Sequence, residues 1–193
     1  MARIEEFDRD TVLLKAMNVF WENGYNGTSM QDLVATTGLN RSSIYNSFGS
    51  KLELYQDTLK HYQKKSGVYF QRALMKAGSP LEAIRGIFES FLPEMISDSG
   101  SKGCFAMNCK AEMGNQNKDI TKWLLDAQEN TLSVFKELIA DGQQQGTINT
   151  EQDSKTYAYH IFNALQGFRM TGILVKDRKV LQQIIDTALK VIT

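Results

Sequence analysis

Residues 28–51 read TSMQDLVATTGLNRSSIYNSFGSK, and this stretch decides the fold. Ser29 and Asp32 have the spacing of a capping box, which predicts the start of a short helix near them. Gly38 supplies the positive φ at which such a helix commonly ends. Asn40 is a favourable N-cap for a second short helix. Two short helices around a tight turn are typical of a helix-turn-helix motif, in which the second helix reads DNA.

The second helix of this pair is rich in side chains that donate hydrogen bonds to phosphates and base edges. A helix N-terminus also attracts phosphate through its backbone N–H groups and its dipole, which adds the start of the first helix. The candidate DNA-contacting residues are therefore Thr28, Ser29, Asn40, Arg41, Ser42, Ser43, Tyr45 and Asn46, with Lys51 just beyond.

Residues 10–60 resemble the DNA-binding domain of the TetR family of transcriptional regulators. The resemblance rests on the spacing of Ala16, Phe20, Gly24, Tyr25, Thr28, Ser29, Leu33, Val34, Gly38, Leu39, Ile44, Tyr45, Phe48 and Lys51. It implies that Tyr45 and Lys51 contact phosphates. It also implies a homodimeric repressor that binds double-stranded operator DNA. Such a dimer reads a pseudo-palindrome with half-sites roughly 34–36 Å apart.

The composition is that of a globular chain with a substantial core. Of 193 residues, 42% are hydrophobic and 23% charged, and only 2 are proline. Long helical patterns with few strand-like runs predict an all-α fold of about nine helices. No apolar run of about 20 residues and no secretory signal is present, so we expect a cytoplasmic protein without a membrane span.

The charge balance weighs against DNA binding. The formal net charge is +0, and residues 1–60 contain more acidic than basic side chains. Binding must therefore depend on where the charges lie. The same balance keeps an alternative open, a helical interaction module whose helix-turn-helix no longer binds DNA.

The helix that begins after Ser50 is expected to connect two domains. Residues 1–50 form the predicted DNA-binding domain, and residues 51–193 form the predicted effector-binding and dimerisation domain. Pro93 is expected to kink or shorten a helix over 80–96. The remaining predicted elements are helices over 9–23, 50–76, 103–113, 117–141, 153–175 and 178–192, and a loop over 98–101.

Aromatic and methionine residues are frequent between positions 69 and 113, where they fill either a packed core or a cavity. The resemblance implies a pocket for a small-molecule effector. The residues expected to line it are Phe70, Phe88, Phe91, Met95, Cys104, Met107, Trp123, Asn163 and Gln166.

Cys104 and Cys109 have neither the spacing of a zinc site nor the number needed for a disulfide framework. The ordinary interpretation is that both are small buried apolar residues. The alternative concerns Cys104, which follows Lys102 and Gly103 at a predicted helix start, where the helix dipole lowers a thiol pKa. In that case the chain is a regulator that senses an electrophile or an oxidant.

Two apolar stripes run along the last two predicted helices. They serve either to cap the chain's own domain or, as the resemblance implies, to join two copies through a four-helix interface. The expected interface residues are Phe168, Gly172, Leu181, Ile184, Ile185 and Ala188.

No catalytic motif supports an enzyme. His61 and His160 are isolated, and no HExxH, GxSxG or phosphate-binding glycine loop occurs. We expect no metal and no cofactor, and we retain a helical enzyme or cofactor carrier only as an alternative use of an aromatic cavity.

Overall fold

The computed structural model describes residues 7–97 and 102–193, and within these ranges every regular element is a helix. The predicted all-α fold is therefore confirmed; the predicted loop over 98–101 lies outside the described residues. The ten helices of the described part are α1 (Arg9–Gly27), α2 (Met30–Thr37), α3 (Arg41–Phe48), α4 (Lys51–Lys76), α5 (Pro80–Glu89), α6 (Leu92–Met95), α7 (Phe105–Met113), α8 (Lys118–Gln144), α9 (Ser154–Thr171) and α10 (Arg178–Lys190). The short α6 follows a break before Pro93, so the helix predicted over 80–96 is divided in two.

Side-chain caps set the starts of the three helices that follow α1. The Ser29 hydroxyl accepts from the backbone N–H of Asp32 at 3.1 Å, and the Asp32 carboxylate accepts from the Ser29 N–H at 2.8 Å. The Asn40 side chain caps α3, and the Ser50 side chain caps α4. Gly38 ends α2 with φ 79°, as predicted.

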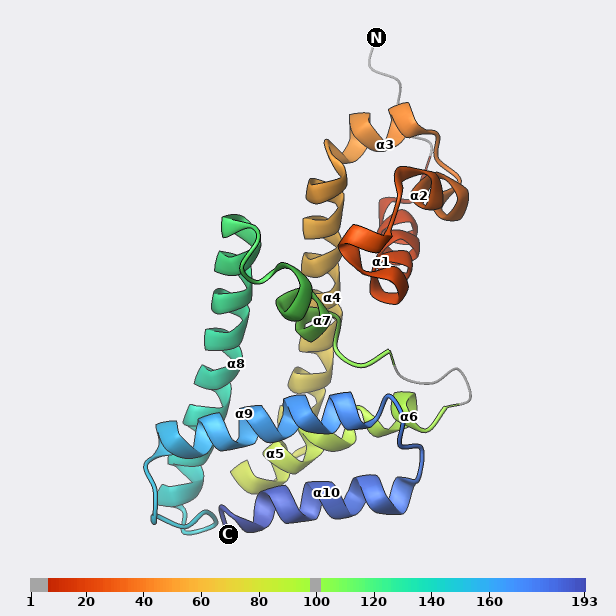
Figure 1. Cartoon of the computed structure of the whole chain (residues 1–193). Coiled ribbons are helices and arrows are strands. Elements are labelled where there is room, and N and C mark those ends of the chain that lie inside the picture. The colour runs from red at the N-terminus through yellow and green to blue at the C-terminus, as the bar shows by residue number, and fades with distance from the viewer. Residues whose placement is uncertain (1–6, 98–101) are drawn as a thin grey trace.

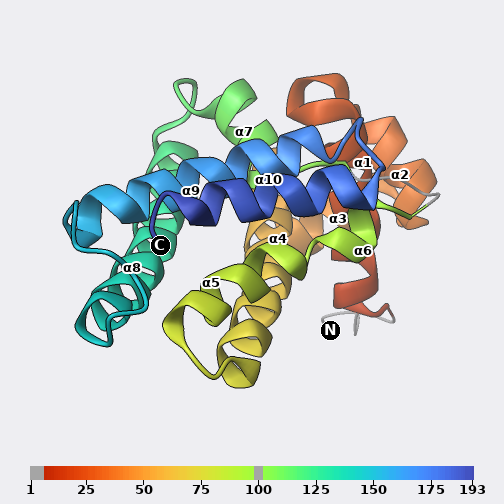
Figure 2. The ribbon, with the colours of Figure 1, turned by 90° about the horizontal axis from the view of Figure 1, so that it is seen from below.

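Helix α4 is the long central element of the molecule (Figure 1). Its first half packs with α1, α2, α3 and α7 in one hydrophobic cluster, which includes the buried side chains of Leu54 and Leu59. Its last turns pack with α5, α8, α9 and α10 in a second cluster, which includes Ala73. Helices α9 and α10 run side by side across the end of the molecule opposite α3 (Figures 1 and 2). One continuous helix therefore extends from the helix-turn-helix to the C-terminal helices.

None of the helices in the described ranges is long and apolar enough to span a bilayer.

Candidate functional site

Helix α3 presents a polar face to solvent and an apolar face to the core. Ile44 and Phe48 are buried, whereas Arg41, Tyr45 and Asn46 are exposed. The Arg41 guanidinium lies 5.9 Å from the centre of the Tyr45 ring, so the two long side chains are close to one another at the surface. The exposed face therefore carries the donors that DNA contact requires.

The caps use some of the candidate DNA-contacting groups. The Asn40 side-chain oxygen accepts from the Ser43 backbone N–H at 2.8 Å, and the Ser29 hydroxyl donates to the Asp32 carboxylate at 2.7 Å. Ser29, Asn40 and Ser42 are nevertheless exposed, and Ser43 is half-buried. Contact between these residues and DNA stays a prediction.

Thr28 does not fit its predicted role. It is only 1% exposed, its hydroxyl donates to the Gly24 carbonyl at 2.6 Å, and its backbone N–H donates to the Tyr25 carbonyl. A residue enclosed in this way cannot reach a phosphate in this conformation. Thr28 instead caps the last turn of α1, which follows the kink at Gly24, where φ is 75°.

Lys51 lies at the start of α4, half-buried, with its ammonium 4.4 Å from the centre of the Tyr25 ring. Arg9 contacts the end of α3. Its guanidinium donates to the Ser47 carbonyl at 3.0 Å and forms an ion pair with Asp57 of α4 at 2.9 Å. The sequence interpretation did not single out Arg9. Its role is to fix α3 against α1 and α4.

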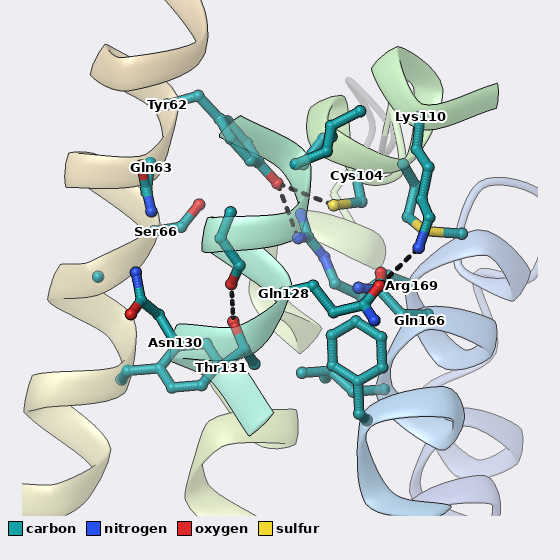
Figure 3. Close-up of a pocket in the computed structure, with 18 of the residues that line it drawn as sticks. Tyr62, Gln63, Ser66, Cys104, Lys110, Gln128, Asn130, Thr131, Gln166 and Arg169 are labelled. Atoms are coloured by element: carbon teal, nitrogen blue, oxygen red, sulfur yellow. Dashed lines mark hydrogen bonds between the residues drawn. The ribbon is translucent and has the colours of Figure 1, made fainter. Parts of the chain in front are cut away.

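A cavity of about 270 Å³ lies between α4, α7, α8 and α9 (Figure 3). Apolar and aromatic side chains form most of its wall, and a small set of polar groups faces it. The lining residues are Tyr62, Gln63, Ser66, Gly67, Phe70, Phe91, Cys104, Ala106, Met107, Lys110, Trp123, Leu124, Ala127, Gln128, Asn130, Thr131, Val134, Phe162, Leu165, Gln166 and Arg169.

Most residues expected to line a pocket do line this cavity, namely Phe70, Phe91, Cys104, Met107, Trp123 and Gln166. Three do not. Phe88 is fully buried against Phe168, with ring centres 5.6 Å apart. Met95 is 2% exposed and packs on Gly172, and Asn163 faces solvent. Phe88 and Met95 pack in the core and Asn163 lies on the solvent side of α9, so none of the three lines the cavity.

Arg169 is the main cavity residue that the sequence interpretation missed. It follows Phe162, Leu165 and Gln166 on the cavity-facing side of α9, and it is 7% exposed. The signal was present in the sequence, because a charged residue interrupts an otherwise apolar stripe. Such a residue needs a buried partner or a ligand.

Arg169, Tyr62 and Cys104 form a network on one side of the cavity (Figure 3). Arg169 donates to the Tyr62 oxygen at 2.7 Å, and the Tyr62 hydroxyl donates to the Cys104 sulfur at 3.4 Å. Burial, reinforced by Cys104, raises the pKa of the Tyr62 phenol well above its usual range, so Tyr62 is neutral. The network thus joins a permanent cation to a thiol through a neutral hydroxyl.

The two thiols occupy different surroundings. Cys104 lies on the cavity wall, whereas Cys109 is fully buried in the cluster around α4. Burial raises the pKa of the Cys109 thiol. Both cysteines are free.

Helix α7 links the cavity to the helix-turn-helix. Cys104, Met107 and Lys110 contribute to the cavity from this segment. Two residues further along, the Glu112 carboxylate accepts from the backbone N–H groups of Tyr25 and Asn26 at 2.8 and 2.7 Å. Helix α7 therefore contacts both the cavity and the last turn of α1, just before α2.

The predicted dimer residues divide into two groups. Phe168, Leu181 and Ile185 are buried within the protomer's own core, and Gly172 packs on Met95. These four are corrections, because their side of the stripe packs inward and is closed to a partner. Ile184 and Ala188 remain partly exposed. The apolar residues left open on or next to α9 and α10 are Tyr159, Met170, Leu174, Val180 and Val191.

Comparison with known families identifies both parts of the chain. The family model described as bacterial regulatory proteins, tetR family, matches residues 12–58. The model described as tetracyclin repressor-like, C-terminal domain, matches residues 80–188.

Individual relatives span essentially the whole chain. The HTH-type transcriptional regulator YezE of Bacillus subtilis (strain 168) is 28% identical over 193 residues, 100% of both chains. The HTH-type transcriptional repressor ComR of Escherichia coli (strain K12) is 29% identical, covering 97% of this chain and 90% of ComR. A solved structure of the TetR family transcriptional regulator CifR, a cysteine mutant complexed with 26-bp double-strand operator DNA, is 26% identical. It has a TM-score of 0.85 and covers 97% of this chain and 98% of that one.

Proposed function

The chain belongs to the tetR family of bacterial regulatory proteins, and from this premise we propose that a small effector in the α4–α9 cavity releases it from its operator. It is a DNA-binding transcriptional regulator. The proposal makes it a repressor that acts in the cytoplasm as a homodimer. Residues 1–50 would bind DNA, residues 51–193 would bind the effector and a second copy, and the cavity would serve binding and not turnover.

One observation carries the proposal: helix α7 contacts both the cavity and the last turn of α1, which leads into the helix-turn-helix. Residues of α7 line the cavity, and Glu112 of the same helix holds the backbone of Tyr25 and Asn26. A molecule that enlarges the cavity would displace α7 and the adjoining part of α4. That displacement would change the separation of the two α3 helices in a dimer and mismatch them with their half-sites. A coupling of about 1–3 kcal/mol, or roughly 5–150-fold in affinity, is usual and sufficient.

The relatives support repression. ComR is named a repressor, and the CifR structure contains operator DNA. The test is a gel shift of this chain against the DNA upstream of its own coding region, across a range of salt. A retarded band that weakens with salt and disappears with an effector is expected. If the chain retards this DNA no more than unrelated DNA at any salt concentration, the result favours the interaction-module alternative.

A second candidate is sensing through Cys104, and the Tyr62 hydrogen bond to its sulfur favours it. Cys104 lies on the cavity wall, and the Tyr62 hydroxyl connects its sulfur to the Arg169 guanidinium. The Cys104 sulfur would attack an electrophilic carbon of an unsaturated reagent and form an S–C bond. The displaced electron pair of the carbon–carbon double bond stays on the reagent, which takes up the proton that the thiol loses.

The test treats the regulator with N-ethylmaleimide and then measures operator affinity. Loss of affinity in the wild type but not in Cys104→Ser would support sensing, and Cys109→Ser is the matched control. If Cys104→Ser loses affinity on treatment as the wild type does, sensing through Cys104 is rejected.

A further inference from the structure

The guanidinium of Arg169 is held inside the protein by neutral groups. It donates to the Tyr62 oxygen at 2.7 Å and to the Gly103 carbonyl at 3.0 Å, and it lies 4.2 Å from the centre of the Phe91 ring. Across the described residues, no carboxylate comes within ion-pair distance of it. The Glu94 carboxylate, which lies further away, contributes to raising the pKa of Arg169. A guanidinium has five N–H donors, so these two hydrogen bonds leave further donors to use.

Burying a cation without an anionic partner is costly, and neutral hydrogen bonds and an aromatic face offset that cost only in part. Arg169 is nevertheless the one charged side chain among the buried residues of the described part. The same residue lines the cavity. An anion that enters the cavity would supply a countercharge that none of the described residues places within ion-pair distance.

The rest of the cavity wall has the same electrostatic character. Among the described residues, its lining includes a second cation, Lys110, and neither aspartate nor glutamate. Lys110 is exposed and donates to the Gln128 side-chain oxygen at 2.6 Å, a neutral partner again. Lys110 therefore adds positive potential at the solvent-exposed side, and Arg169 lies at the buried side.

Besides Arg169, Gln166 offers a ligand in the cavity a second polar group to bind. Its side-chain oxygen is buried and has no hydrogen-bond partner in the part of the chain that the structure describes. It lies one turn before Arg169 on α9 and lines the same cavity. A buried acceptor without a donor is costly, so a ligand that donates a hydrogen bond here would be favoured.

We propose that the effector is a small organic carboxylate, whose anionic group pairs with Arg169 and whose body lies against the aromatic wall formed by Phe70, Phe91 and Trp123. A hydrogen-bond donor on the same molecule would meet the Gln166 oxygen. The cavity of about 270 Å³ lies just below the range usual for drug-sized ligands, which selects a compact molecule. This assignment rests on the proposed effector-binding function and adds the chemical class.

The experiment is a thermal-shift panel on the full chain. It uses small alkyl and aryl monocarboxylates, each compared with its own primary amide, which has nearly the same shape without the charge. At least one carboxylate is expected to raise Tm more than its amide does. If no carboxylate exceeds its amide, the proposal is overturned.

Variants locate the binding. Arg169→Met keeps an apolar body of similar length, and it should weaken the best carboxylate roughly tenfold or more, the scale of a hydrogen bond to a charged group. Tyr62→Phe removes a neutral partner and leaves the cation, so carboxylate affinity should stay the same or tighten. If Arg169→Met fails to fold, Arg169→Lys is the substitute, with a smaller loss because one point charge replaces the planar fork. Undiminished carboxylate binding in the position-169 variant would reject Arg169 as the anion site.

Operator release is measured separately, by fluorescence anisotropy of labelled upstream DNA. Carboxylate binding at Arg169 without release would retain the ligand site and reject the proposed regulation. Release by the amides and not by the carboxylates would retain the regulation and reject the anionic effector.

Discussion

Arg41 stands exposed on the first turn of α3, with its guanidinium near the Tyr45 ring. An arginine in this position can bond the edge of a guanine with two N–H groups. We expect Arg41→Ala to weaken operator binding by about 1–3 kcal/mol and to relax specificity at one base pair. Fluorescence anisotropy at fixed salt measures this loss. Arg72→Ala, an exposed arginine far along α4, is the control, and an Arg41 loss no larger than the control would remove it from the contact set.

Asp32 makes the stability of α2 depend on pH. Hydrogen bonds from the Ser29 hydroxyl and backbone N–H, with a contribution from Lys51, hold the pKa of this carboxyl below its usual value of 3.8. A lowered pKa in the folded state means that the stabilisation is complete above the unfolded value. It is lost as pH falls through the folded value.

We therefore expect acid to destabilise the wild type more than Asp32→Asn. Urea midpoints at pH 7 and near pH 3 measure the difference. Equal acid sensitivity in the two proteins would show that the capping box has no part in it.

At the scale of elements, α7 is short and connects two larger bodies. One side of it lines the cavity, and Glu112 on it accepts hydrogen bonds from two backbone N–H groups in the last turn of α1. A half-buried carboxylate that bonds two main-chain donors is a defined mechanical contact, because removing it leaves those donors without their acceptor.

We expect Glu112→Ala to reduce the local stability of this turn by about 1–3 kcal/mol. Hydrogen exchange at the Tyr25 and Asn26 amides should accelerate, and effector and operator binding should become less coupled. Glu129→Ala, an exposed glutamate on α8, is the control for the loss of one negative charge. Unchanged exchange at both amides would mean that Glu112 does not hold the turn.

At the scale of the whole molecule, we expect the dimer face to lie over the open apolar residues on or next to α9 and α10. Leu174 is 87% exposed and Val180 is 40% exposed, whereas Leu181 is completely buried. A protomer that leaves such side chains in water gains free energy when a second copy covers them.

Leu174→Glu combined with Val180→Glu is therefore expected to give a folded monomer with much weaker operator binding. Sedimentation velocity reports the mass, and circular dichroism reports the fold. Leu125→Glu, on an exposed leucine of α8, is the matched control and should remain dimeric. Leu181→Ala should behave differently: it should cost about 2–5 kcal/mol of stability by leaving a core cavity. A dimer in the Leu174/Val180 variant would place the interface elsewhere.

The local features of the fold could be predicted because their causes lie close together in the chain. Ser29 meets Asp32 and Asn40 meets Ser43, three residues apart in each case, and the predicted starts of α2 and α3 follow from these pairs. The polar face of α3 also follows from helical periodicity alone. Family resemblance then supplied the DNA-reading role of that face.

The cavity and the interface required the tertiary structure. Arg169 and Tyr62 are 107 residues apart, and Glu112 and Tyr25 are 87 apart, so no local pattern reveals either contact. Periodicity identifies an apolar side of α10 but cannot show whether Leu181 or Val180 faces the core, because the stripe is broad enough to serve both core and surface. Thr28 likewise lies at a predicted helix start, where a phosphate contact is expected, yet the tertiary structure buries it. Short-range hydrogen bonds determined where the helices begin, and long-range packing decided which side chains remain free to bind.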